Sequence, residues 1–121
     1  MSTDPPPSRE PARQPAAPLS GGELVELLRR RWQASYDLQL VQRRGRIYLQ
    51  VMWAYLEQQS FPLTAAAYAD RIEEVAGLLN GMGVAAQVRQ WLSTTAERPR
   101  LGRAMTLGLD LPPERLGEYL L

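Results

Sequence analysis

The sequence predicts an α+β fold, in which a small antiparallel sheet carries helices packed mainly on one face. Apolar residues recur at helical spacing in four segments and alternate residue by residue in three others. These segments follow one another in the order α-β-β-α-α-β-α. A chain of 121 residues has room for one domain, and helices laid over one face of a short sheet are the natural way to bury its apolar side.

Residues 1–18 differ in composition from the rest of the chain. They hold six of the ten prolines and no bulky apolar residue between Met1 and Pro18. Such a stretch cannot bury enough apolar surface to offset the entropy lost when it becomes ordered. We therefore predict a disordered proline-rich tail over residues 1–18 and a single α+β domain over residues 19–121.

The first helix has a well-marked start. Ser20 and Glu23 have the spacing of a capping box, and Leu19 and Leu24 have the spacing of a hydrophobic staple. The sequence predicts a helix over 21–34. Its apolar stripe consists of Leu24, Leu27, Leu28 and Trp32.

Alternating apolar residues then predict a hairpin. Residues 36–41 alternate with period two, residues 43–46 supply a turn that contains Gly45, and a second apolar run covers 47–56. The β-branched and aromatic residues of this run favour a strand. Because it is apolar nearly throughout, its periodicity leaves open whether residues 53–58 are strand or helix.

The C-terminal half predicts two helices, a strand and a short last helix. Thr64 is a suitable N-cap for a helix that ends at Gly81 and Gly83, and a third helix begins near Val84 and stops before Pro99. A third strand covers Met105–Leu109. Pro112 and Pro113 then open a terminal helix with Leu116, Tyr119 and Leu120 on its buried side.

Composition excludes several kinds of chemistry. The chain contains no Cys and no His, which excludes disulfides, thiolate or imidazole zinc sites, Cys nucleophiles and Ser-His dyads. We predict no cofactor, no metal site and no catalytic residues. The net charge of +1 argues against a strongly electrostatic partner, and no apolar run is long enough for a transmembrane segment, so we expect a soluble protein.

Several blocks of residues together resemble a known family. They are Trp32, Ser35–Asp37, Leu49–Trp53, Tyr55–Gln58, Ser60–Leu63, Gln87–Val88 and Arg98–Gly102. In this order they resemble a small domain-of-unknown-function family of cyanobacteria and plant plastids, and the resemblance covers nearly everything after the tail. It implies a cytoplasmic cyanobacterial protein, or a plastid stromal one in plants, with no assigned activity. An accessory role near the photosynthetic apparatus follows only by association.

Arginine residues form three groups, and all 14 basic residues are arginine. The groups are Arg29–Arg31, then Arg43, Arg44 and Arg46 in the predicted turn, and Arg98, Arg100 and Arg103 near the third strand. If the last two groups converge, they form an anion-binding patch, because guanidinium groups suit phosphate and carboxylate. Otherwise the first group complements a helix dipole and the others are solvated loops.

The second strand predicts a different surface. If Trp53 faces the helices, then Tyr48, Gln50 and Met52 lie on the opposite face of the sheet. An open face with an aromatic residue and a methionine would be a docking surface for another protein. The alternative is that the terminal helix covers this face. For Trp32, Trp53 and Trp91, core packing is the expected role.

We therefore predict a non-catalytic protein-interaction or assembly module, with another protein as its partner. The alternative is binding of RNA or another anionic ligand through the arginine loops, although the near-neutral charge and the lack of an RNA-binding signature argue against it. A third hypothesis is an enzyme that uses carboxylates or arginines. Acid–base catalysis by a pair of carboxylates would require the side chains of Asp37 and Glu57 to lie close together. Oligomeric state is not predicted.

Overall fold

The computed structural model describes residues 17–119, and its element order confirms the predicted α+β fold. The elements are α2 (Gly21–Trp32), β1 (Tyr36–Arg43), β2 (Arg46–Tyr55), α3 (Ala65–Met82), α4 (Ala85–Thr94), β3 (Met105–Gly108) and α5 (Pro113–Tyr119). Almost all of the predicted tail lies outside the described residues, as do Leu120 and the side chain of Leu116. Leu19 is buried and exchanges two hydrogen bonds with the Asn80 side chain.

The predicted N-caps Ser20 and Thr64 are formed, whereas the Glu23 carboxylate, the other half of the predicted capping box, binds Arg89. Ser20 Oγ accepts a hydrogen bond from the Glu23 amide at 3.0 Å, and Thr64 Oγ1 accepts one from the Ala67 amide at 3.1 Å. Helix α2 ends two residues earlier than predicted, because Gln33 adopts a left-handed conformation with φ of 59°. Gly83, with φ of 77°, ends α3 in the same way.

The three strands form one antiparallel sheet in the order β1-β2-β3. A two-residue loop joins β1 to β2, and its residues Arg44 and Gly45 have φ of 54° and 75°. Two positive φ values are the signature of a type I′ turn, whose twist matches that of the flanking strands. Strand β2 continues to Tyr55 and is followed by a turn, so residues 53–58 are strand and turn, with no helix.

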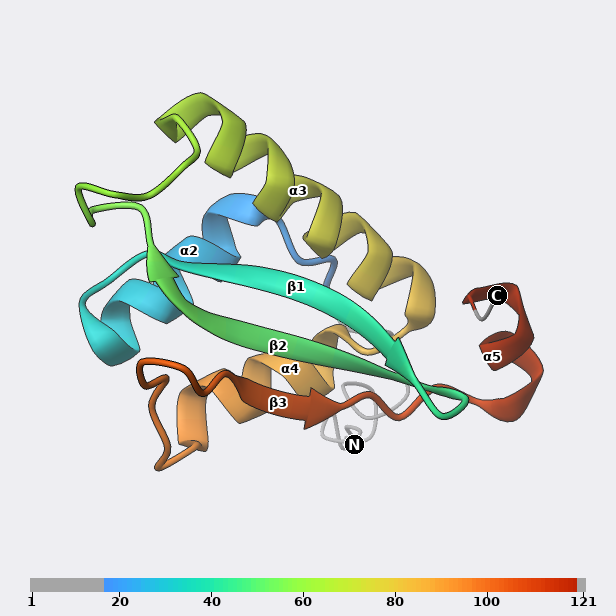
Figure 1. The fold of residues 1–121 in the computed structure, drawn as a ribbon. Coiled ribbons are helices and arrows are strands. Elements are labelled where there is room, and N and C mark those ends of the chain that lie inside the picture. The colour runs from blue at the N-terminus through green and yellow to red at the C-terminus, as the bar shows by residue number, and fades with distance from the viewer. Residues whose placement is uncertain (1–16, 120–121) are drawn as a thin grey trace, which may run out of the picture.

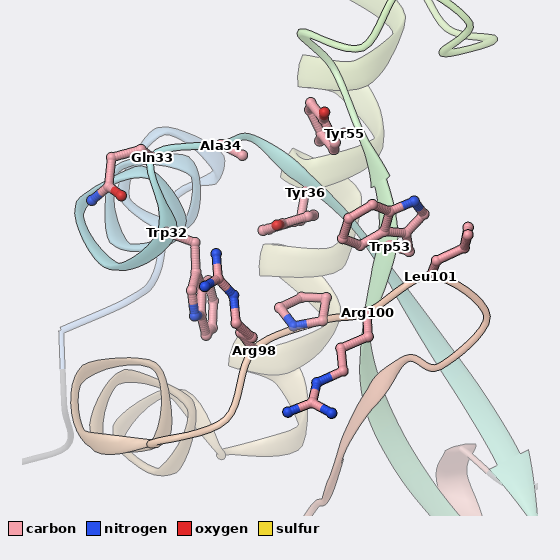
Figure 2. A pocket seen from close by; sticks show the side chains of 10 residues that line it. Trp32, Gln33, Ala34, Tyr36, Trp53, Tyr55, Arg98, Arg100 and Leu101 are labelled. Atoms are coloured by element: carbon pink, nitrogen blue, oxygen red, sulfur yellow. The ribbon is translucent and has the colours of Figure 1, made fainter.

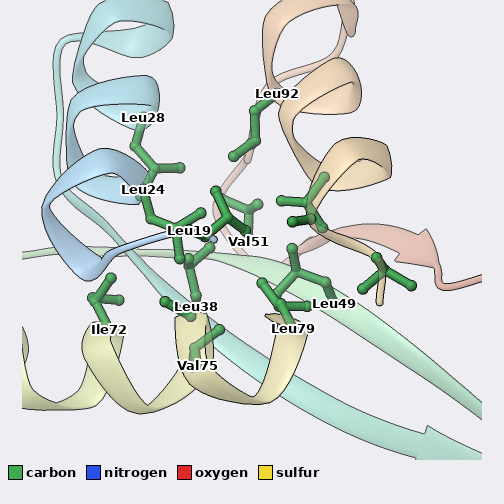
Figure 3. Close-up of a cluster of buried hydrophobic side chains, with 14 of the residues drawn as sticks. Leu19, Leu24, Leu28, Leu38, Leu49, Val51, Ile72, Val75, Leu79 and Leu92 are labelled. Carbon is green, nitrogen blue, oxygen red and sulfur yellow. The ribbon is translucent and has the colours of Figure 1, made fainter. Parts of the chain in front are cut away.

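The core lies between the sheet and the helices α2, α3 and α4, as Figure 3 shows. Register partners place Leu49 of β2 beside Leu40 and Leu107, and Val51 beside Leu38 and Met105. The helices supply the rest of the core. Its fully buried members include Leu24, Leu28, Leu38, Leu49, Val51, Ile72, Leu79 and Leu92.

The helices cover one face of the sheet. Helices α2, α3 and α4 all lie on the same side of the three strands (Figure 1). Helix α5 does not cover the other face, because it lies at the C-terminal end of α3, where the Arg115 guanidinium donates to the Gly81 carbonyl. The helices of residues 17–119 therefore leave the second face of the sheet uncovered. None of these helices combines the length and apolarity needed to cross a bilayer.

Candidate functional site

The uncovered face of the sheet carries two rows of side chains that cross the strands. The first row is Val41, Tyr48 and Gly108, and the second is Gln39, Gln50 and Thr106; within each row the residues are register partners. Met52 follows Gln50 on the same face of β2 by the alternation of the strand. The residues predicted for docking, Tyr48, Gln50 and Met52, thus lie on one open surface, which we call the open sheet face.

Tyr48 packs along this face instead of standing out into solvent. A Cβ placed on Gly108 would lie 3.5 Å from the Tyr48 ring, so the ring rests against the glycine backbone of β3. The Arg46 guanidinium lies over the same ring, 5.9 Å from its centroid. Tyr48, Gln50 and Met52 are partly buried.

The two arginine groups that would have formed a joint patch lie at opposite ends of the sheet. Arg43, Arg44 and Arg46 surround the hairpin turn, whereas residues 98–103 precede β3. Since Tyr48 pairs with Gly108 and Val51 with Met105, the start of β3 lies at the end of β2 far from the turn. The separation along β2 is roughly 20 Å at ~3.3 Å per residue. The condition for a shared anion-binding patch is not met.

A pocket that the sequence analysis missed lies at the far end of β2 (Figure 2). It has a volume of about 500 Å³ and lies between the end of α2, the end of β2 and the loop before β3. We call it the aromatic pocket. Its lining includes Trp32, Tyr36, Trp53 and Tyr55, together with residues 98–101.

The four rings of the aromatic pocket contact one another. Tyr36 lies at their centre, with its ring centroid 6.0 Å from that of Trp32, 5.6 Å from that of Tyr55 and 6.4 Å from that of Trp53. The first two contacts are edge-to-face, the geometry that aromatic pairs prefer. Trp32 and Tyr36 are buried, as core packing predicts, but Trp53 and Tyr55 are only partly buried. One side of this cluster therefore faces the pocket.

Helix α2 holds the loop that forms the opposite wall of the pocket. The Trp32 indole N–H donates to the Glu97 carbonyl at 3.2 Å, and Arg31 donates to the Thr95 carbonyl. Pro99, two residues after Glu97, is fully buried at the edge of the pocket. The loop is thereby anchored on one side, while Leu101 at its tip is 80% exposed.

The two carboxylates considered for acid–base chemistry serve separate structural roles. Glu57 accepts hydrogen bonds from the Ser35 amide at 2.9 Å and the Ser35 hydroxyl at 2.8 Å, and its other partner is Arg29 at 2.5 Å. Burial alone would raise the pKa of Glu57, but these partners outweigh it and the pKa is lowered. They join the end of α2 to the end of β2, just behind the aromatic pocket.

Asp37 is buried and pairs with Arg71 of α3 at 2.8 Å. Burial raises its pKa, and the nearby Arg71 guanidinium only partly offsets this effect. Asp37 and Glu57 thus each have their own arginine, and the described residues that line the aromatic pocket include no acid. Within the described part of the chain, no three acidic side chains gather as a metal site would require.

One signal in the sequence pointed to the pocket. The alternation of β2 places Trp53 and Tyr55 on the same face as Val51. They follow the part of β2 that pairs with Leu38 and Leu40 of β1. Two aromatic residues at the end of a core-facing row are typical of a ring cluster at the margin of a core. The contribution of residues 98–101 could not be seen, because it depends on contacts with α2 from more than 60 residues earlier.

Comparisons with known proteins agree with this architecture. The chain is similar to the Alr2454 protein of Nostoc sp. strain PCC 7120, whose structure was determined in solution by NMR: the two share 45% sequence identity and a TM-score of 0.76, over 85% of this chain and 98% of that one. None of the curated proteins matches. Residues 22–120 match the family described as "Domain of unknown function (DUF3067)". This chain therefore belongs to the DUF3067 family, and the predicted resemblance to a cyanobacterial family of unknown function is confirmed.

Proposed function

We propose that this chain is a non-catalytic protein-interaction module that docks another protein on its open sheet face. The observation that supports this proposal is the one-sided coverage of the sheet. Strands β1, β2 and β3 bury one face under three helices and leave a second face that carries Tyr48, Gln50 and Met52.

The composition of the open sheet face suits a protein interface. Its two rows contain an aromatic ring, a valine and amide or hydroxyl side chains, and no carboxylate. Interface cores are enriched in aromatic residues and methionine and are depleted in charge, and a polar rim surrounds them. Arg43 and Arg46 at the hairpin end would form part of such a rim.

The roles of the acidic side chains support the non-catalytic part of the proposal. Asp37, Glu57 and Glu23 each pair with an arginine, and the partner of Glu23 is Arg89 at 2.6 Å. A general acid or base needs a carboxylate that faces a cleft where a substrate can approach. These three instead join neighbouring elements of the fold.

Capture of partners from cell lysate by the tagged full chain tests this proposal. The test variant is Tyr48→Ser with Met52→Ser, and the matched control is Leu78→Ser, which removes an exposed apolar side chain from α3 on the other side of the molecule. A protein that docks on the open sheet face should be captured by the unmodified chain and by the control, and lost with the double variant. Capture should change little between low and high salt, because apolar docking does not depend on screening.

Two results would contradict the proposal. One is that the double variant, shown to be folded by an unchanged unfolding midpoint, captures the same proteins as the unmodified chain. The other is that capture by all three forms disappears as salt is raised, which indicates binding by charge.

Binding of RNA is a second candidate, and one observation favours it. Arg46 lies over the Tyr48 ring on the open sheet face, beside Gln50, and sheet-based RNA-binding domains stack bases on exposed aromatic rings. A fluorescent single-stranded RNA would then bind with an affinity that falls steeply with salt.

A cytoplasmic location in cyanobacteria, a stromal one in plastids and a link to the photosynthetic apparatus all stay predictions.

A further inference from the structure

We propose that the aromatic pocket and the basic hollow beside it bind an acidic segment of a partner protein that carries a bulky apolar side chain. This inference rests on the proposed protein-interaction function but concerns a second site, separate from the open sheet face. The basic hollow is a neighbouring concave surface lined by Glu97, Arg98, Arg100, Arg103 and the start of β3. The loop of residues 98–101 forms a wall of both sites.

The aromatic pocket supplies the apolar half of the site. Trp53 and Tyr55 are partly buried against Tyr36 and leave ring surface toward a space of about 500 Å³. This volume falls within the range of ligand pockets, ~300–1,000 Å³, and exceeds what one large side chain requires. Rigid rings that are already held by edge-to-face contacts lose little freedom when a ligand binds. The pocket therefore suits a phenyl-sized or larger apolar group.

The arginines supply the charged half. Figure 2 shows the Arg98 side chain beside Trp32, whereas Arg100 extends away from the rings on the other side of the loop. None of Arg98, Arg100 and Arg103 forms an ion pair within residues 17–119. By contrast, Arg29, Arg71 and Arg89 each bind a carboxylate.

The charged side chains around the basic hollow indicate whether its ligand is negatively or positively charged. Three guanidinium groups and one carboxylate, that of Glu97, line the basic hollow. Aromatic rings alone would also suit a cation, but a cation in the pocket would lie close to Arg98 and be repelled. Carboxylates form strong charge-assisted hydrogen bonds with guanidinium groups. Charge complementarity therefore favours an acidic ligand over a cationic one.

The arrangement of the two hollows favours a peptide segment. They share Arg98 and Arg100 as lining residues, so a short extended segment that passes over the loop can place one side chain among the rings and a nearby side chain beside the arginines. A membrane surface is less suitable, because Leu101 is the exposed large apolar side chain of this loop and one such residue gives weak interfacial binding. Vesicle binding is therefore an outcome of the test.

Titration of the full ¹⁵N-labelled chain with short matched peptides tests the proposal by NMR. The probes are acetyl-Asp-Phe-Asp amide, its neutral Asn-Phe-Asn and basic Lys-Phe-Lys counterparts, and Asp-Gly-Asp, which lacks the ring. The indole N–H signals report the location, because Trp32 and Trp53 line the aromatic pocket and Trp91 lies elsewhere, on α4 beside Leu107. The acidic Phe peptide should shift the Trp32 and Trp53 signals, leave Trp91 unchanged and bind more tightly than the other three.

Variants separate this site from general attraction by positive charge. Arg98→Gln with Arg100→Gln should lower the affinity for the acidic peptide by about tenfold or more, because charge-assisted hydrogen bonds are lost. Arg43→Gln with Arg44→Gln is the matched control, since it removes the same charge at the opposite end of the sheet, and it should change affinity less than about twofold. Tyr48→Ser with Met52→Ser should leave peptide binding intact, so failure of this site and failure of the open sheet face are distinguishable.

Three outcomes would overturn the proposal. The first is that no peptide shifts Trp32 or Trp53 at millimolar concentration. The second is that the basic peptide binds as tightly as the acidic Phe peptide or more tightly. The third is that the double variants at Arg98 and Arg100 and at Arg43 and Arg44 lower the affinity for the acidic peptide equally. Binding to vesicles of phosphatidylglycerol, lost with Arg98→Gln and Arg100→Gln while the peptides fail to bind, would assign the loop to a membrane surface instead.

Discussion

Each end of the sheet carries one of the arginine groups that the sequence singled out in its loops, but the two ends are built in different ways. At the hairpin end, two residues, Arg44 and Gly45, turn the chain between neighbouring strands. At the pocket end, α2, β2 and the loop before β3 meet, and their contacts join residues 22 to 65 positions apart. The hairpin end depends on local backbone geometry, and the pocket end on tertiary contacts.

This difference indicates where binding can be specific. At the hairpin end Arg46 lies over a single ring, that of Tyr48, and beside a smaller hollow of about 330 Å³ whose lining within the described residues includes Asp110 and no aromatic residue. At the pocket end Arg98 lies beside Trp32, in a pocket whose lining includes three further rings. Charge beside a rigid apolar surface recognises the shape of a ligand as well as its sign.

The largest expected difference between the two ends follows from removing one buried ring. Trp32→Ala should lower the free energy of unfolding by about 3 kcal/mol or more, because it empties a buried site beside Tyr36 and removes the hydrogen bond to the Glu97 carbonyl. Urea unfolding followed by circular dichroism measures this loss.

Controls at both ends sharpen the result. Trp32→Phe keeps a ring but has no N–H donor, and should cost less than half as much. At the hairpin end, Arg46→Ala removes only an exposed cation from the Tyr48 ring and should cost less than about 1 kcal/mol. A Trp32→Ala protein as stable as Arg46→Ala would mean that the pocket end is not anchored by this ring.

The carboxylate behind the pocket should give an intermediate effect that depends on pH. Glu57→Gln weakens the hydrogen bonds to Ser35 and removes the ion pair with Arg29. We expect a loss of about 1 kcal/mol at neutral pH, since both ionic side chains are partly solvated. Urea unfolding of the variant and of the unmodified chain at several pH values measures it.

The direction of the pH dependence follows from the lowered pKa of Glu57. A carboxyl whose pKa is lower in the folded state stabilises the fold above its unfolded pKa of about 4.3, and this stabilisation disappears as pH falls through the folded pKa. The difference between the two proteins should therefore shrink toward zero in acid. A difference that stayed constant from neutral pH to well below 4 would show that the Glu57 charge is not the cause.

The features of the fold that could be predicted are those encoded by neighbouring residues. Ser20 and Thr64 mark helix starts, Gly83 marks a helix end, and Gly45 marks the hairpin turn. The alternation in β2 also assigned its two faces, since buried Leu49 and Val51 flank Gln50. The helical boundary after Trp32 was missed by two residues, because Gln33 rather than a glycine takes the left-handed conformation.

Only the part of the candidate site that neighbouring residues encode could be predicted. Alternation was enough to place Tyr48 and Gln50 on the open sheet face. The aromatic pocket depends on Trp32 reaching Glu97 and on Ser35 reaching Glu57, and no local pattern encodes either contact. The hypothesis of a shared anion-binding patch needed the two arginine loops to converge, which the antiparallel register rules out.

The smallest expected effect is the difference in stability cost between the two turns, which can be compared directly because each contains a glycine with almost the same φ. Gly45 has φ of 75° and Gly102 has φ of 76°, and a Cβ on either would meet no atom within 4 Å. Alanine at either position is therefore strained only by the backbone, at about 1 kcal/mol if the turn cannot relax. Urea unfolding of Gly45→Ala and Gly102→Ala measures the two costs.

The flanking residues should decide how much of that strain is retained. Gly45 lies between the paired Arg43 and Arg46 of two long strands, so Gly45→Ala should cost close to the full amount. Gly102 lies in a turn closed by a single bridge between Arg100 and Arg103, so this loop can adjust and Gly102→Ala should cost less than about 0.5 kcal/mol. An equal cost at both positions would contradict the expected adjustment and would show that the wall of the aromatic pocket is as rigid as the hairpin. A wall of that rigidity is preformed, and the acidic peptide would then bind without the cost of ordering the loop.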